Sequence, residues 1–284
     1  MKKRFVFLFI PLVLLLLVST NVEAVQFWHK DTNTKGNWIE NIDGTWVKHY
    51  GQDGYILSAF DSQGHNNEEW QQSFDRKNLP PYITNYTVSG TGGASPLSPG
   101  TAGVYTVAAP TPDERTLIDP DILGDPDVLD KRRNTYWFTT PYDDPDTVLT
   151  VELEFSGAAS DKFFHLSLYF LGIDQNGKLN VTVSDDEPFG APQTWSVIIE
   201  PEEAKTGVYL VFTVYGPTKL EIKLSPETLP DNSLAAYISG IFIDSIALPP
   251  HVVPEVPLGT LSALISCFIP LMLLKKIKRK HASE

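Results

Sequence analysis

The second half of the chain consists of short β-type segments, and this pattern constrains the fold more than any other feature. In TVLTVELEF (147–155), apolar and polar residues alternate, which is typical of a strand with one buried face. FFHLSLYFLGI (163–173) is apolar at nearly every position and predicts a strand buried on both faces. The Asn-Gly pair in DQNG (174–177) then predicts a hairpin turn into the next strand.

More strands follow at short intervals. LNVTVSD (179–185) and KLEIKL (219–224) alternate in the same way, with one apolar face and one polar face. TWSVIIE (194–200), GVYLVFTVYG (207–216) and YISGIFIDSIAL (237–248) supply the remaining candidates. No convincing amphipathic helix interrupts the series, so the sequence predicts an all-β sandwich.

The first half of the chain holds fewer clear strands. About residues 88–130 contain many Gly and Pro residues, including SGTGGASPLSPG (89–100). We interpret this region as a long loop over the sandwich, within a single domain that spans residues 25–248. A flexible linker is the alternative.

The N-terminus has the pattern of a secretory signal peptide. A basic stretch at residues 2–4 precedes an apolar run at residues 5–18, and small residues flank Glu23. The pattern predicts a signal peptide over residues 1–24, cleaved after Ala24. An uncleaved membrane anchor is the alternative, although the apolar run is short for a full span.

The C-terminus predicts a membrane anchor. The 17 residues 258–274 are apolar or small, which is the lower limit for a spanning helix. The basic tail, residues 275–284, is expected to remain in the cytoplasm, so the protein would be single-pass in the cell membrane with its ectodomain outside.

A Pro-rich spacer, residues 249–257, precedes the predicted helix and contains Pro254, Glu255 and Pro257. A Pro-Glu motif, an apolar helix and a basic cluster together resemble the PEF-CTERM and PEP-CTERM sorting signals of archaeal and bacterial surface proteins. The resemblance implies processing by an archaeosortase-like enzyme. A plain membrane anchor after a Pro-rich spacer explains the same residues.

The expected ectodomain is strongly acidic. Residues 25–257 hold 14 Lys and Arg against 33 Asp and Glu, a formal charge of −19, which disfavours nucleic acid as a partner. The only cysteine, Cys267, lies in the predicted membrane helix, so the ectodomain has no disulfide and must rely on its core. Sequons predict N-glycosylation at Asn85 and Asn180, the second on the outward face of its strand.

Seven segments of the ectodomain, taken in their order along the chain, resemble a known family. They are DTNTKGNW (31–38), YGQDGY (50–55), PDERTL (112–117), NTYWF (134–138), HLSLYFLGIDQNGK (165–178), GVYLVFTVYGPTKLEIKL (207–224) and SGIFID (239–244). Together they resemble extracellular modules of prokaryotic surface proteins with a galactose-binding-domain-like jelly roll. The resemblance implies a jelly-roll-like sandwich and a role beside carbohydrate-active or adhesive domains. In this chain ENIDGTWVK (40–48) is inserted between the first two phrases.

Aromatic residues are the candidates for sugar binding, because an aromatic ring can stack on the apolar face of a sugar. Trp46, in the insertion, and Trp70 are the first candidates for ligand binding, followed by Tyr105, Trp137 and Tyr142. By contrast, the resemblance assigns Trp38, Tyr50 and Tyr55 to the framework of the fold.

An acidic segment, IDPDILGDPDVLD (118–130), is a candidate calcium site, since Ca²⁺ prefers carboxylate oxygens. A solvated acidic loop with Asx-type turns is the alternative. The candidate ligands are Asp119, Asp121, Asp125 and Asp127, with further acids at Asp130, Asp143, Asp144 and Asp146. A structural Ca²⁺ is implied by the family resemblance only.

Enzyme signatures are scarce in this sequence. It has no G-x-S-x-G, H-E-x-x-H or phosphate-loop motif, and His165 falls in a buried-looking strand. We therefore expect a non-catalytic binding or adhesion protein of the cell surface, with a glycan or a surface-layer protein as partner. The alternatives are a structural component of the envelope or surface layer, and a glycan-active hydrolase built on paired carboxylates.

Overall fold

The computed structural model describes one β-rich body between residues 25 and 246. The predicted signal peptide, spacer, membrane helix and basic tail lie outside the described residues. Those described are 25–42, 45–62, 68–91, 101–108, 111, 113–120, 132–139, 147–159, 162–172, 177–185, 193–227 and 236–246. None of the helices formed by these residues is long and apolar enough to cross a membrane.

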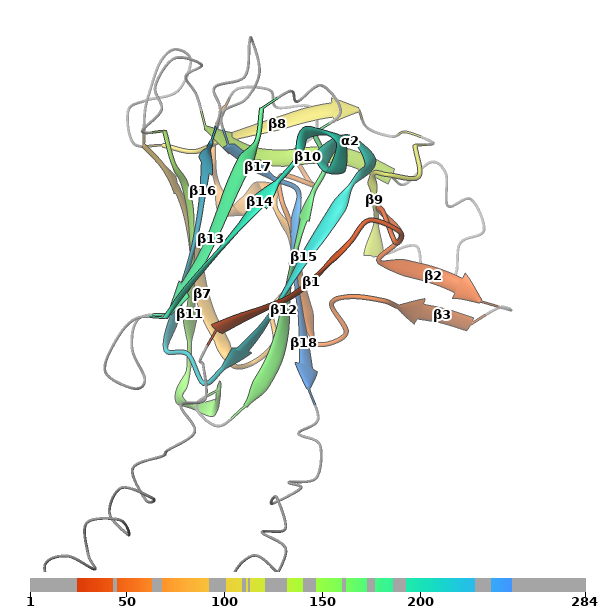
Figure 1. Ribbon diagram of the computed structural model, residues 1–284. Coiled ribbons are helices and arrows are strands. Elements are labelled where there is room, and N and C mark those ends of the chain that lie inside the picture. Colours follow the sequence, from red (N-terminus) through yellow and green to blue (C-terminus); the bar gives the residue numbers. More distant parts are fainter. Residues whose placement is uncertain are drawn as a thin grey trace, which may run out of the picture. The chain divides into compact units, whose positions relative to one another are not determined.

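A six-stranded antiparallel sheet forms one layer of this body (Figure 1). In spatial order its strands are β1 (Val25–Asp31), β15 (Val208–Tyr215), β12 (Phe163–Phe170), β18 (Gly240–Ile246), β4 (Gly54–Leu57) and β6 (Arg76–Asn78). Neighbouring strands are far apart in the chain, so this layer depends on contacts of long sequence separation.

A five-stranded antiparallel sheet forms the second layer. Its order is β14 (Thr194–Ile199), β13 (Leu179–Asp185), β16 (Lys219–Pro226), β11 (Leu149–Phe155) and β7 (Ile83–Gly90). Along β11, β13 and β16, buried apolar residues alternate with polar residues that face solvent. This period of two is the one that the sequence shows, and it gives the sheet one apolar and one wet face.

The main core lies between the two sheets. Its members include Val151 and Val181 of the five-stranded sheet and Leu166 and Leu210 of the six-stranded sheet, all buried. The all-β sandwich predicted from sequence is therefore confirmed. Residues 166–170 are buried on both faces as predicted, because Leu166 faces this core while Tyr169 packs in a second cluster on the other side. At the start of the strand the prediction was wrong, since Phe163 and His165 are only half-buried.

A smaller sheet lies beside the sandwich. It contains β17 (Ala236–Ile238), β10 (Arg132–Thr139), β8 (Gly103–Ala108) and β5 (Glu68–Glu69), and β9 (Leu117–Ile118) also pairs with β10. β8 and β9 fall inside the predicted loop of residues 88–130, so that prediction was wrong for these two segments. Both are short and become strands by pairing with β10, a partner that the local composition cannot reveal.

The predicted hairpin at residues 174–177 was also wrong. β12 pairs with β15 and β18, whereas β13 pairs with β14 and β16, so the two strands belong to different sheets. The chain crosses between layers at this point. An Asn-Gly pair favours a tight turn, but it does not determine which neighbour the following strand takes.

A short α-helix was not predicted from the sequence. α2 (Pro201–Thr206) connects β14 to β15 and begins with proline at its first turn. The carboxylate of Glu200 accepts from the backbone of Glu203, whose own side chain accepts from the backbone N–H of Glu200. This reciprocal cap stabilises a helix too short to show apolar periodicity.

The outer face of the six-stranded sheet carries a second apolar cluster. Residues 31–39 and 113–118 cover this cluster, and Gly36 donates its backbone N–H to the Glu114 carbonyl at 3.2 Å. Trp38 and Tyr55 are buried, and the Tyr50 ring stacks on Tyr209 with centroids 4.2 Å apart. These aromatic residues of the opening phrases therefore pack the fold, as expected for the framework.

The insertion forms a separate hairpin, β2 (Ile39–Ile42) with β3 (Thr45–Lys48), which projects from the body in Figure 1. A hydrogen bond of 2.7 Å from the His49 N–H to the Trp38 carbonyl closes its base. Ile42 and Val47, on one face of the hairpin, are 47% and 38% exposed.

Candidate functional site

Part of the outer face of the six-stranded sheet is not covered by the second cluster. At this place β1, β12 and β15 present a group of partly or fully exposed rings with polar neighbours. We call it the aromatic face, and it consists of Gln26, Trp28, His29, Phe163, His165, Thr213 and Tyr215.

A β-bulge in β1 produces the most exposed ring of this face. Phe27 pairs with Phe212 and His29 with Val211, so Trp28 is an extra residue in the ladder. Phe27 packs inward against Phe212, with ring centroids 5.5 Å apart. Trp28 turns outward and is 58% exposed. Bulges often redirect a side chain in this way.

Neighbouring rings hold Trp28 in place. Its ring lies on His165 with centroids 4.2 Å apart and an interplanar angle of 31°, and His29 meets it edge-on at 4.6 Å. In the adjacent row, Phe163 and Tyr215 pack with centroids 4.3 Å apart. The indole is therefore both exposed and oriented.

A polar row crosses four strands beside these rings. Gln26 pairs with Thr213, Thr213 with His165, and His165 with Asp244 of β18. Partial burial and the neighbouring His29 lower the pKa of His165, so its imidazole is neutral at pH 7. Burial raises the pKa of Asp244, whose carboxylate accepts the Gly51 N–H at 2.9 Å. The row offers an amide, a hydroxyl and an imidazole close to the stacked rings.

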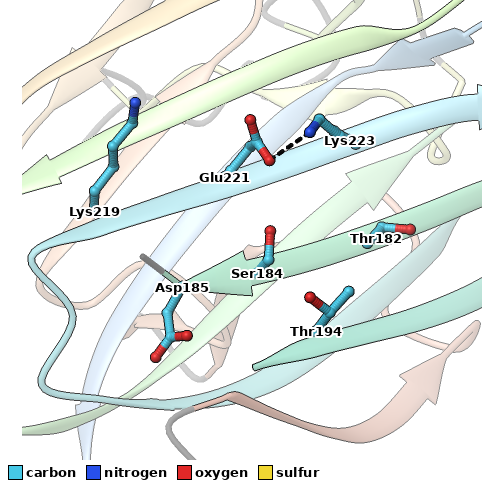
Figure 2. A pocket seen from close by; sticks show the side chains of 7 residues that line it. All are labelled: Thr182, Ser184, Asp185, Thr194, Lys219, Glu221 and Lys223. Atoms are coloured by element: carbon cyan, nitrogen blue, oxygen red, sulfur yellow. Dashed lines mark ion pairs between the residues drawn. The ribbon is translucent and has the colours of Figure 1, made fainter. Parts of the chain in front are cut away.

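The wet face of the five-stranded sheet carries a hollow of about 400 Å³ (Figure 2). Hydroxyls line it from β13 and β14, and charged side chains line it from β13 and β16. The hydroxyls belong to Thr182, Ser184 and Thr194, and the charges to Asp185, Lys219, Glu221 and Lys223. Lys223 pairs with Glu221 at 2.6 Å, and Lys219 pairs with Glu152 of β11 at 2.7 Å.

Two of the predicted ligand-binding tryptophans converge on one buried carboxylate. The Asp75 side chain accepts from the indole N–H of Trp137 at 2.7 Å and from that of Trp70 at 2.9 Å. It also accepts from the Tyr86 hydroxyl and the Ala59 backbone N–H, each at 2.8 Å. Trp137 has no exposed surface, so it packs the core instead of forming a platform, and Trp70 is only partly exposed.

Asp75 is itself an unusual acid. Burial raises its pKa to about 6, although all four hydrogen bonds act in the opposite direction. The group is ionised at neutral pH, with each oxygen accepting two donors.

The other predicted ligand residues are not brought together. Tyr105 is half-buried and stacks on Tyr136 with centroids 5.3 Å apart. Trp46 lies in β3 opposite Asn41, and its side chain is outside what the structure describes. Tyr142 lies outside the described residues as well.

Most of the predicted calcium ligands lie outside the residues that the structure describes. Asp119 forms an ion pair with Arg76 at 3.2 Å. The other candidates, Asp121, Asp125, Asp127, Asp130, Asp143, Asp144 and Asp146, lie outside the described residues. Among the described residues, no group of three or more His, Cys, Asp or Glu is arranged to hold a metal ion.

Both sequons lie on the wet face of the five-stranded sheet. Asn85 is exposed on β7, and Asn180 is half-buried on β13, two residues before Thr182 of the hollow. The outward orientation expected for Asn180 is confirmed. Ala24, Pro254, Glu255 and Pro257 of the predicted processing signals lie outside the described residues.

Sequence reasoning missed Trp28 and its partners. Trp28 directly follows the segment VQF, and a bulge has no apolar period that would reveal it. His165 reads from sequence as an ordinary core residue. The aromatic face exists only because β1, β15 and β12 are adjacent in space.

The fold is that of an all-β sandwich of antiparallel sheets. No protein-family model and no curated protein matches it. Among solved structures, the enzymatically active domain of tailspike protein 4 of bacteriophage CBA120 is similar, with 12% identity, a TM-score of 0.33 and coverage of 57% of this chain. This chain covers only 20% of that one.

A structure described as a carbohydrate-binding module of the β-sandwich superfamily with promiscuous specificity is also similar. It has 11% identity and a TM-score of 0.29, and the match covers 79% of this chain and 98% of the module. Because both likenesses are remote, we base the function proposed below on the side chains of this chain.

Proposed function

We propose that the protein is a non-catalytic glycan-binding or adhesion module of the cell surface, a jelly-roll-like domain anchored by its C-terminal helix. One observation carries the proposal: the Trp28 ring is 58% exposed and lies on His165 with centroids 4.2 Å apart. Exposing a large apolar ring to water is unfavourable, and the Trp28 ring stands in a group of rings with His165, Phe163 and Tyr215, as expected for a surface that contacts a ligand.

The chemistry around Trp28 suits a sugar. The apolar face of a pyranose can stack on the indole while its hydroxyls bind Gln26, Thr213 and His165 in the adjacent row. The stacked neighbours already fix the ring, so binding would order little that is mobile, and pre-organisation of this kind favours affinity.

The carboxylates of the wet face support a non-catalytic role. Glu152 and Glu221 lie opposite each other on adjacent strands, where an acid pair for glycoside hydrolysis would be sought. Each is engaged in an ion pair with a lysine, at 2.7 and 2.6 Å. Both carboxylates of this pair are therefore already bound to lysine side chains of the same sheet.

A structural role in the envelope or surface layer is the second candidate. The projecting β2–β3 hairpin exposes Ile42 and Val47 on one face, which would suit contact with another protein.

A glycan array tests the proposal, with the full chain solubilised in detergent. We expect wild type to bind a polysaccharide and Trp28→Ala to weaken that binding about tenfold or more, as for a central aromatic contact. Ile198→Ala is the matched control, because it removes an exposed apolar side chain from the other sheet. Failure of the folded wild type to bind any glycan, or equal binding by Trp28→Ala, would refute the proposal.

A further inference from the structure

β14 is an edge strand of the five-stranded sheet. Among the described strands it pairs with β13 alone, in a regular ladder without a bulge. Its sequence, TWSVII, contains no charged residue and no proline. Thr194, Ser196 and Ile198 are exposed, whereas Trp195 and Val197 are half-buried. A free edge of this composition can pair with a further strand.

The other edge strands of the two large sheets carry features that hinder such pairing. β1 has its bulge at Trp28, and β6 consists of three residues, of which Arg76 and Lys77 are basic. At β7, the side-chain amide of Gln72 donates to the Tyr86 carbonyl at 3.4 Å. Bulges, charges, short strands and covering segments are the means by which proteins protect sheet edges. β14 itself has no bulge and no charge, and it is twice as long as β6.

The ladder determines which backbone groups of β14 point away from β13. Directly before β14, the Asp185 N–H donates to the Gln193 carbonyl at 3.2 Å. Bonded and non-bonded pairs alternate in an antiparallel ladder, so the odd-numbered residues of β14 bond to β13 and the even-numbered ones point outward. The Ile198 carbonyl confirms this direction, because it accepts from the Lys30 ammonium group at 2.7 Å. The other outward groups of β14 have no strand beside them among the described residues.

A second copy of β14 matches this edge. In an antiparallel pair centred on Ser196, the N–H of each Ser196 donates to the carbonyl of the partner's Ser196, and each Ile198 N–H donates to the partner's Thr194 carbonyl. None of these bonds uses the Ile198 carbonyl, which is already occupied. On the inner face, each Trp195 then lies opposite the partner's Val197. Cross-strand pairs of an aromatic and a β-branched residue stabilise neighbouring strands.

Charge also favours contact along β14. The chain has a formal charge of −13, so two copies repel each other over most of their surfaces. β14 is uncharged, and the charged residues next to its end form ion pairs, Lys30 with Glu203 at 2.6 Å and Lys178 with Glu200 at 3.1 Å. Two copies can therefore approach along this edge without bringing like charges together.

We propose that the protein forms a symmetric dimer in which β14 pairs antiparallel with β14 of a second copy. The two five-stranded sheets then become one continuous sheet across a two-fold axis. This inference does not rest on the glycan site proposed above.

A charge-swap experiment tests the dimer, with the full chain in detergent. The host should attach no N-glycan, because Asn180 is the neighbour of Ile198 on β13. Sedimentation velocity measures the dissociation constant of the wild-type dimer. Ser196→Lys and Ser196→Glu each place two like charges opposite each other at the two-fold axis, so each should weaken the dimer about tenfold or more. An equimolar mixture of the two variants should restore it, since opposite charges then meet.

Ser89→Lys is the matched control, because it makes the same change at an exposed position of β7, the opposite edge strand of the sheet. It should leave the dissociation constant unchanged. Ser196→Pro provides a second variant, since the Ser196 N–H points away from β13 and proline is tolerated at such edge positions. It should also weaken the dimer.

Three results would overturn the inference. A monomeric wild type would leave this edge to a strand of another protein. A dimer that none of the Ser196 variants weakens would have its contact elsewhere in the chain. A mixture of Ser196→Lys and Ser196→Glu that stays monomeric would exclude the symmetric register.

Discussion

At the scale of the residue, Asp75 determines the role of two tryptophans. Both Trp70 and Trp137 donate to its carboxylate, together with Tyr86 and the Ala59 backbone. Nothing in the sequence connects these residues, since Trp137 lies 62 positions from Asp75. A tryptophan beside acids in the sequence could equally be a platform or a core residue, and only the buried carboxylate distinguishes the two.

Asp75→Asn should destabilise the fold. The amide has nearly the same shape as the carboxylate. However, its NH₂ group would replace an oxygen that now accepts two hydrogen bonds, so donors would face donors at that position. We expect a loss of about 2–4 kcal/mol in the free energy of unfolding, measured by chemical denaturation. Glu154→Gln, which makes the same change from carboxylate to amide on an exposed side chain, should have little effect. Equal stability of wild type and Asp75→Asn would contradict this role.

Asp75 also predicts a pH dependence. Burial raises its pKa in the folded state from 3.8 to about 6. The folded protein therefore binds a proton at Asp75 more tightly than the unfolded chain does. The resulting gain in unfolding free energy is fully present below about pH 4 and is lost as the pH rises through 6. The size is of the order of 2–3 kcal/mol, because each pKa unit corresponds to about 1.4 kcal/mol. The difference in unfolding free energy between wild type and Asp75→Asn should therefore narrow from pH 4 to pH 7. A difference that widens would mean that the hydrogen bonds outweigh burial.

At the scale of the element, the cover over the second cluster depends on a close crossing of two segments. A Cβ on Gly36 would lie 2.0 Å from the Thr116 carbonyl oxygen. Arg132 fastens the same crossing by donating to the Thr116 carbonyl at 2.9 Å and the Glu114 carbonyl at 3.1 Å. Glycine is needed at position 36 because two backbones meet there.

Gly36→Ala should lower the melting temperature. The added methyl group forces the cover away from the six-stranded sheet, and we expect a cost of about 3 kcal/mol, as for other overpacked sites. Gly157→Ala is the matched control, because a Cβ at Gly157 would meet nothing within 4 Å. Similar melting temperatures for both variants would contradict this prediction, because they would show that the backbones near Gly36 and Thr116 can move apart at little cost.

The elements of the second half could be read from sequence, and those of the first half could not. β11, β13 and β16 alternate residue by residue, so their buried faces were predictable. β8 and β9 are short and lie in a region of the chain rich in Gly and Pro, and their pairing with β10 decides their structure. For the same reason the Asn-Gly turn after β12 predicted a hairpin where the chain changes sheets.

At the scale of the whole molecule, the sandwich follows from composition and alternation, but the sites do not. The aromatic face combines residues 26–29, 163–165 and 213–215, which come together only through the strand order β1-β15-β12. The hollow likewise depends on the neighbours of β13. Sequence reasoning chose aromatic residues for their ability to stack on a sugar, and this criterion also selected Trp137, which is fully buried.

The central claim is that Trp28 is the glycan platform, and the indole N–H signals of the six tryptophans test it directly. We would titrate the ¹⁵N-tryptophan-labelled full chain in detergent with the polysaccharide selected by the array and follow its ¹H–¹⁵N spectrum. The Trp28 signal should shift progressively, while those of Trp38, Trp70 and Trp137 remain in place. A titration in which bound glycan shifts only the Trp46 signal, and leaves Trp28 unmoved, would contradict the account and place the site on the hairpin.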